Sequence, residues 1–224
     1  LKKEFKVDPD KEAYDRFLSL EMIWPDNALL RSYVLSPRLG QISANLLEVS
    51  SVRLYHDNVL AKQSGCGRTP WHFDDHHFPL DTNDVVTAWA PVQPTPIEMG
   101  PLSFAYPLDV RKLVKDVTFE KTGTGYDSEV SKIFSKNNVS VNETPFELGE
   151  VSFHHNLNFH TASRNRTNHS RIALANTYYR DGARVINSPT MVSGDWQKFM
   201  PNVKPGDIAA SPLNPICWPV KSEI

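Results

Sequence analysis

The sequence predicts a mainly β domain, an antiparallel sandwich or barrel with helices packed on one side. Helical patterns come first, over about the first 50 residues. Short β-branched and aromatic runs follow them, separated by turns and long loops. There is no internal repeat, and 224 residues suit one large domain. We expect helical support over about residues 1–50, a barrel over about 51–182 and an irregular tail or lid over about 183–224.

Three helices are expected before the barrel. The first covers residues 8–24, which Asp8 could cap and which Pro25 ends. Its apolar residues, Tyr14, Phe17, Leu18 and Met22, recur at helical spacing. The second covers about residues 26–35, and the third covers about 37–47 after Ser36-Pro37, a pair typical of a helix start.

Alternating or β-branched runs predict the strands of the barrel. These runs are Val52 to Leu60, Asp84 to Val92, Leu102–Tyr106, Pro145 to His155 with a turn at Gly149-Glu150, and Arg171 to Tyr179. Residues 108–142 are charged and weakly patterned, so we expect an insertion over the surface with a short helix from Asp127 to Phe134.

Composition argues against several classes of function. The formal net charge of −2 gives no basic footprint, so nucleic acid is not an expected partner. No run of 18 apolar residues exists, so no membrane span is expected. Cys66 and Cys217 are expected to be free thiols. We expect a cytoplasmic protein, although the first residue is Leu1 and a targeting signal at that end is unreadable. The oligomeric state stays open.

The residues most suited to chemistry lie between Pro70 and Phe78, where three histidines and two aspartates occur within nine positions. His72 and Asp74 are two residues apart, so both project from one face of an extended strand. An imidazole and a carboxylate are two of the three protein ligands of a non-haem iron(II) facial triad. The motif alone is weak, because a hydrogen-bonded pair in a loop has the same sequence. Candidates for the third ligand are His154, His155, His160 and His169.

Arg171 supplies a second indication. It follows His160 by 11 residues and opens an otherwise apolar strand. A buried guanidinium is costly unless it meets an anion, and its fork fits a carboxylate. Iron ligands together with an inward arginine are what a keto-acid cosubstrate requires. The alternative for Arg171 is an ordinary surface ion pair.

Several segments together resemble the phytanoyl-CoA dioxygenase family of iron(II)- and 2-oxoglutarate-dependent oxygenases. The resemblance extends from about residue 50 to 182. The segments that carry it are Tyr55 to Lys62, Thr69 to Asp74, Asp84 to Trp89, Gly100 to Leu102, Gly149 to His154, and His160 to Asn165 with Arg171.

The resemblance implies a double-stranded β-helix, a jelly-roll or cupin-like barrel. It implies that His72, Asp74 and His160 hold Fe(II) and that Arg171 binds the distal carboxylate of 2-oxoglutarate. Trp89 matches a position that lines the cosubstrate pocket, and Asn58 falls where the family often contacts the cosubstrate. The implied enzyme uses O2 to hydroxylate an unactivated C–H bond of a small-molecule metabolite, with release of succinate and CO2. Desaturation and cyclisation stay open.

The chain departs from the family pattern in three respects, one of which is that the family's N-terminal strand region is not visible in the sequence. Phe73 stands between the two metal ligands where a polar residue is common, and Phe104 to Leu108 replace the usual segment after the Gly-Pro-Leu strand. Asp75, His76 and His77 could line the substrate mouth or be solvated. His155 is the rival of His160, and Trp89 could be a core aromatic. His56 and Asp57 are expected to be structural.

Two other functions fit part of the pattern. One is a cupin-like metal or small-molecule binding protein without turnover. The other is a zinc hydrolase, because two histidines and an aspartate also bind zinc. The hydrolase lacks an obvious general base and leaves Arg171 unexplained. No CoA-binding pattern is evident, so a thioester substrate is not assumed.

Overall fold

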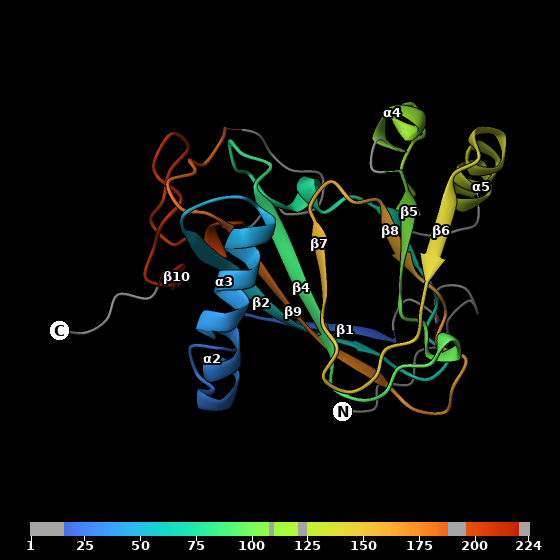
Figure 1. Cartoon of the computed structure of the whole chain (residues 1–224), viewed down its shortest axis with the longest axis horizontal. Coiled ribbons are helices and arrows are strands. Elements are labelled where there is room, and N and C mark those ends of the chain that lie inside the picture. The colour runs from blue at the N-terminus through green and yellow to red at the C-terminus, as the bar shows by residue number, and fades with distance from the viewer. Residues whose placement is uncertain (1–15, 108–109, 121–124, 188–195, 220–224) are drawn as a thin grey trace, which may run out of the picture.

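Two antiparallel β-sheets face each other in a computed structural model of the chain, which describes residues 16–107, 110–120, 125–187 and 196–219 (Figure 1). The larger sheet has the order β1 (Phe17–Glu21), β2 (Val52–Lys62), β9 (Arg171–Arg180), β4 (Val85–Pro91) and β7 (Ser152–His155), and β10 (Ile216–Trp218) also pairs with β2. The smaller sheet has the order β3 (Thr69–His72), β8 (His160–Ala162), β5 (Leu102–Tyr106) and β6 (Ser140–Glu143).

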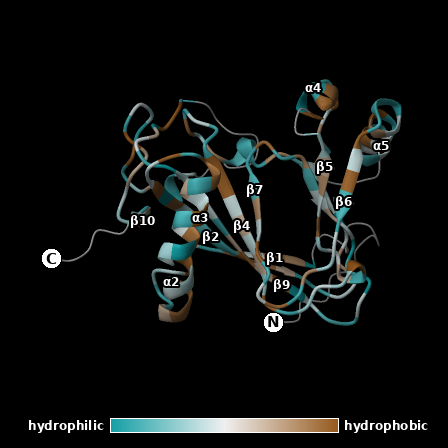
Figure 2. Ribbon diagram, in the orientation of Figure 1, coloured by the Kyte–Doolittle hydropathy of each residue, from teal (hydrophilic) through white to brown (hydrophobic). Residues whose placement is uncertain are grey.

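The chain crosses repeatedly between these sheets, since β2, β4, β7 and β9 belong to the larger sheet and β3, β5, β6 and β8 to the smaller one. This winding is a double-stranded β-helix, and the predicted fold class is confirmed. Strand β4 lies within the larger sheet, all its residues are buried, and it is coloured from white to brown in Figure 2. Such strands read as continuous apolar runs, which explains why the sequence predicted it.

Two short helices cover the outer face of the larger sheet (Figure 1). They are α2 (Ala28–Val34) and α3 (Pro37–Leu46), close to the predicted bounds. The side chain of Asn27 caps α2 by accepting a hydrogen bond from the Leu30 amide, and Pro37 begins α3. Val34 and Leu39 are buried against the sheet, which holds the helices away from the barrel interior.

The helix predicted over residues 8–24 is wrong over residues 16–24, the part of it that the structure describes. Residues 17–21 form strand β1, which pairs with Asn58–Lys62 of β2, and Met22 has a left-handed φ of 56° that no α-helix contains. The spacing of Phe17, Leu18 and Met22 suits a helix, but pairing with the edge of β2 satisfies the backbone of this segment instead. Residues 8–15 lie outside the described residues.

The segment between β5 and β6 carries a helical layer over the smaller sheet. Helix α5 (Gly125–Asn137) includes the predicted helix, and α4 (Val110–Val114) precedes it. Tyr126, Val130 and Phe134 of α5 pack against Trp71 and Phe159. The expectation of an insertion up to residue 142 is wrong at its end, because residues 140–143 form β6 and pair with β5.

Two further segments differ from expectation. The strand predicted from Pro145 to His155 is shorter, since only β7 is a strand and a turn at Gly149, with φ of 97°, precedes it. In the described part of the predicted tail, residues 216–218 form β10, and Trp196, Phe199 and Met200 are buried against Tyr55 and Phe78. Among the described residues, no helix is long and apolar enough to cross a membrane.

Candidate metal centre and cosubstrate pocket

The pairing of β3 with β8 brings two predicted ligands together. His72 and His160 are register partners, and their ring centroids are 4.1 Å apart. Asp74 follows β3 as the first residue of a short 3-10 helix, η1 (Asp74–His77). Its amide donates to the carbonyl of Asn156, which fixes the backbone of the loop beside β8.

The donor atoms of these three side chains converge. The Oδ1 atom of Asp74 lies 3.6 Å from Nε2 of His72 and 3.7 Å from Nε2 of His160. One ligand atom from each residue lies within 4.8 Å of the others, and among the described residues no other such group of His, Cys, Asp or Glu is present. Two imidazole nitrogens and one carboxylate oxygen form the donor set of a facial triad.

Both imidazoles are oriented by the backbone. Nδ1 of His72 lies 2.8 Å from the Pro70 carbonyl oxygen, and Nδ1 of His160 lies 2.9 Å from that of Asn158. A carbonyl only accepts, so each Nδ1 carries the proton and donates it. Each Nε2 is then left with a free lone pair directed at the other ligands. The residues therefore fit a metal ion.

The protonation states also suit a metal. Burial lowers the pKa of His160 well below its usual range, and the nearby His72 adds to this effect. Burial alone would raise the pKa of Asp74, but the imidazoles around it, His160 first and then His154, hold that pKa well below its usual range. At neutral pH the site thus presents a carboxylate and an unprotonated imidazole, the forms that bind cations.

Arg171 lies at the other end of the barrel interior, and the structure adds a lysine that sequence reasoning did not assign. Lys62 and Arg171 are register partners on β2 and β9, and both side chains are buried. Nζ of Lys62 donates to the carbonyls of Ala162 and Ser163, and Nη1 of Arg171 donates to that of Gly100. Among the described residues no carboxylate pairs with either cation, and Nε of Arg171 has no partner.

Burial acts on both cations. It lowers the pKa of Lys62 to about 7, with Arg171 as the next contributor, and it lowers the pKa of Arg171 to about 10. Two buried, adjacent positive groups with no counter-ion are unfavourable unless an anion joins them. This end of the barrel fits a carboxylate.

Trp89 and Asn58 lie on the inner face between the two ends. The register places Asn58 opposite Ala175 and Ala175 opposite Trp89, so the two residues share one row across three strands. Trp89 is buried, its ring lies 5.2 Å from Cζ of Arg171, and its Nε1 donor has no hydrogen-bond partner in the part of the chain that the structure describes. Asn58 accepts a hydrogen bond from the Ser19 hydroxyl through Oδ1. Trp89 therefore lies beside Arg171, whereas Asn58 is partly engaged by β1.

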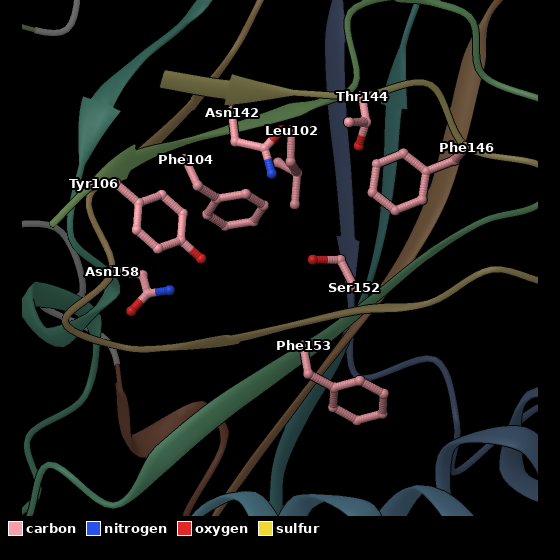
Figure 3. Close-up of a pocket in the computed structure, with 9 residues that line it drawn as sticks. All are labelled: Leu102, Phe104, Tyr106, Asn142, Thr144, Phe146, Ser152, Phe153 and Asn158. Atoms are coloured by element: carbon pink, nitrogen blue, oxygen red, sulfur yellow. The ribbon is translucent and has the colours of Figure 1, made fainter. Parts of the chain in front are cut away.

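A cavity of about 240 Å³ opens beside these residues (Figure 3). Its lining comes from β5, β6, β7 and their loops: Leu102, Phe104, Tyr106, Asn142, Thr144, Phe146, Ser152, Phe153 and Asn158. The Phe104 ring is 5.9 Å from that of His160, and the Phe146 ring is 5.1 Å from that of Trp89. The cavity therefore touches the surroundings of both ends of the site. The hydroxyls of Tyr106 and Ser152 point into it, and none of the described residues that line it is charged.

The other residues that the sequence analysis considered near the site lie in different surroundings. Phe73 faces the helical layer, and Arg111 lies over its ring while pairing with Asp75 at 2.7 Å. The His77 ring is 6.5 Å from that of His72, beside the candidate metal ligands. Asp57 accepts hydrogen bonds from the amides of Ile23 and Trp24, which suits the structural role expected of it.

The alternative third ligands lie elsewhere. Nδ1 of His155 accepts a hydrogen bond from the Leu157 amide, and His169 is exposed in the loop before β9. His154 does reach the site, but it contacts the second carboxylate oxygen of Asp74 at 3.2 Å rather than joining the converging donors. Sequence alone could have placed Lys62 and His154 in the barrel interior only if it had shown which alternate residues of each strand point inward.

Comparisons with known proteins agree with this geometry. The sequence profile of the family described as "Phytanoyl-CoA dioxygenase (PhyH)" matches residues 9–173. A comparison with curated protein sequences gives no significant match.

Solved structures with a similar fold include the non-heme alpha ketoglutarate dependent carbocyclase SnoK from nogalamycin biosynthesis, with a TM-score of 0.73 and 22% identity over 96% of this chain and 79% of SnoK. The epimerase SnoN has a TM-score of 0.72 and 19% sequence identity over 90% of this chain and 78% of SnoN. EctD from S. alaskensis, solved with 2-oxoglutarate and 5-hydroxyectoine, has a TM-score of 0.63 and 13% sequence identity over 85% of this chain and 66% of EctD. At these identities the likeness concerns the fold alone.

Proposed function

Because the chain belongs to the phytanoyl-CoA dioxygenase family of iron(II)- and 2-oxoglutarate-dependent oxygenases, we propose that it hydroxylates an unactivated C–H bond of a small-molecule metabolite. The enzyme class is that of the family, a dioxygenase that uses Fe(II), 2-oxoglutarate and O2. We assign the metal to His72, Asp74 and His160, and the distal carboxylate of 2-oxoglutarate to Arg171. One observation supports the assignment most: the barrel interior contains both the three convergent side chains and two buried cations, Lys62 and Arg171, which pair with no carboxylate of the described residues.

Bound iron would supply the oxidative chemistry, coupling decarboxylation of 2-oxoglutarate to succinate and CO2 with attack on a C–H bond. The protein would supply orientation and exclusion of water. Arg171 and Lys62 would bind the distal carboxylate, since a guanidinium fork and an ammonium both donate to carboxylate oxygens. Trp89 would cover the cosubstrate chain and offer its free Nε1 donor. Asn58 is a weaker candidate for a cosubstrate contact.

Hydroxylation is favoured over halogenation because Asp74 provides the carboxylate that halogenating relatives lack. Hydroxylation, desaturation and cyclisation all begin by removing a hydrogen from the substrate, so the ligands do not separate them. The substrate surroundings differ from chain to chain because they are built from loops. Here the uncharged lining of the cavity argues for a neutral part of the substrate next to the site.

An anaerobic titration tests the assignment. Adding iron(II) and then 2-oxoglutarate to the purified protein should produce a weak visible charge-transfer band, and admitting O2 should release succinate. A metabolite screen that follows succinate would then identify the substrate. Absence of the band would favour a cupin-like binding protein without turnover. Succinate release that zinc supports as well as iron would contradict the oxygenase assignment.

His160→Ala supplies the matched variant. It should abolish the band, because only two of the three proposed ligands remain to hold the metal. His169→Ala, in an exposed loop, should leave the band unchanged. Retention of the band in His160→Ala would place the metal elsewhere.

A further inference from the structure

A row of polar side chains on the larger sheet faces the metal ligands of the smaller sheet. The register aligns His56 with Thr177, Thr177 with Thr87, and Thr87 with His154, one residue each from β2, β9, β4 and β7. The flanking rows on the same face include the apolar Ala175 and Val85. Buried polar side chains need partners, and Asp74 provides one for this row.

The last two members of this row contact Asp74 directly. Nε2 of His154 lies 3.2 Å from Oδ2, and the hydroxyl of Thr87 donates to Oδ2 at 3.4 Å. The Thr87 hydroxyl also lies 3.0 Å from that of Thr177, which extends the chain of hydrogen bonds to β9. His154 is only 3% exposed, so this contact is made away from bulk water.

The two oxygens of Asp74 therefore have different surroundings. Oδ1 faces Nε2 of both His72 and His160, whereas Oδ2 is taken up by His154 and Thr87. A deprotonated carboxylate only accepts, so His154 must carry its proton on Nε2. A nitrogen in that state has no lone pair for a metal, which separates His154 from the ligands.

We propose that His154 is a positioning residue for the metal centre. Its Nε2–H, with the Thr87 hydroxyl, holds Oδ2 of Asp74 so that Oδ1 alone is presented to the metal. Groups that orient a ligand from behind in this way contribute strongly to metal affinity. The inference rests on the proposed assignment of His72, Asp74 and His160 as ligands.

The test measures metal binding by the full chain in the absence of turnover. His154→Phe keeps the size of the ring and removes the donor, whereas His154→Gln places an amide N–H near the position of Nε2. We expect the dissociation constant for Co(II), measured by calorimetry, to rise about 10- to 100-fold in His154→Phe. We expect His154→Gln to recover most of the affinity, and the Co(II) absorption spectrum of wild type to change in His154→Phe but not in His154→Gln.

His155→Asn is the matched control, because His155 is the next residue on β7 but faces away from Asp74 and only accepts from the Leu157 amide. It should bind Co(II) as wild type does. Equal affinity in His154→Phe and wild type would overturn the inference while leaving the ligand assignment intact. Equal losses in His154→Phe and His154→Gln would overturn it too, in favour of His154 as a ligand. Failure of wild type to bind Co(II) would overturn both proposals. If His154→Phe does not fold, Thr87→Val tests the same carboxylate oxygen and should weaken binding.

Discussion

At the scale of single residues, the pairing of Lys62 with Arg171 is the least expected feature of the barrel. Like charges directly opposite each other on neighbouring strands destabilise a sheet, and burial increases that effect. Neither side chain has a carboxylate partner among the described residues. The pair is therefore better explained by a bound anion than by stability of the empty protein.

Substitution of Arg171 tests this explanation. Arg171→Met should raise the KM for 2-oxoglutarate by about 10- to 100-fold, since a hydrogen bond to a charged group contributes about 1.5–3 kcal/mol. Arg171→Lys should fall between Met and wild type, because an ammonium does not reproduce the fork. Succinate formation at varied 2-oxoglutarate provides the measurement. Arg180→Met, in a surface ion pair with Asp84 at the end of the same strand, is the control and should leave KM unchanged.

Lys62 predicts a pH dependence of stability. Its pKa is about 7 in the folded protein against 10.5 as a reference, so between these values the unfolded chain binds more protons and stability rises with pH. Below pH 7 both states are protonated and the penalty is constant. Between pH 7 and 8.5 the gain is about 1.6 kcal/mol, because the folded Lys62 is still half protonated at pH 7 and the slope approaches 1.36 kcal/mol per pH unit only above that pH.

Urea unfolding without ligands measures this gain as the difference in the free energy of unfolding between wild type and Lys62→Met, followed as a function of pH. Only the wild type should gain stability from Lys62 as the pH rises, and using the difference cancels the contributions of other groups. Parallel pH profiles for the two proteins would show that Lys62 is not the source.

At the scale of elements, α3 and β10 approach closely at Gly40. A Cβ atom at this position would lie 2.4 Å from the Cys217 carbonyl oxygen. Gly40→Ala should therefore destabilise the fold by about 1–3 kcal/mol, as overpacking does, although the same change in an exposed helix is stabilising. Thermal unfolding compared with Gln41→Ala, an exposed neighbour in α3, is the measurement. A higher melting temperature for Gly40→Ala would contradict the observed packing.

Sequence patterns predicted the buried elements and missed the peripheral ones for a physical reason. Strands β4 and β9 lie within the sheet, so most of their residues are buried and are apolar, β-branched or aromatic, and the pattern is strong. Strand β6 is an exposed edge strand, and its sequence Ser-Val-Asn-Glu is selected by pairing with β5 rather than by burial.

The site divides in the same way. His72, Asp74 and Arg171 could be proposed because a two-residue spacing and an isolated charge in an apolar run are visible in the sequence, although Asp74 lies in η1 and not on the strand that the sequence predicted. The contact of His154 with Asp74 was not predictable, because it depends on the register of β7 against β4 and on the distance between the two sheets. Choosing between His154 and His155 requires knowing which parity of β7 faces inward.

At the scale of the whole molecule, the candidate site joins the two sheets. The proposed metal ligands come from β3 and β8 of the smaller sheet and from η1 beside it, while Lys62 and Arg171 come from β2 and β9 of the larger sheet. The helical layer contacts the same region, because Arg111 of α4 pairs with Asp75, the residue after the proposed ligand Asp74. The division into helical support, barrel and tail or lid stays a prediction.

A site built from both sheets predicts that metal and cosubstrate together stabilise the entire fold. Ligands that bind only the folded state add about 2.7 kcal/mol at a concentration of 100 times Kd, which shifts the melting temperature of a domain of this size by about 5–10 °C. We expect Mn(II), which replaces iron without oxidation, to raise the melting temperature and 2-oxoglutarate to raise it further. The second increment should disappear in Arg171→Met while the first persists, and both should be reduced in His160→Ala. An undiminished second increment in Arg171→Met would mean that the dicarboxylate binds elsewhere, so this comparison separates the two ends of the site in one measurement.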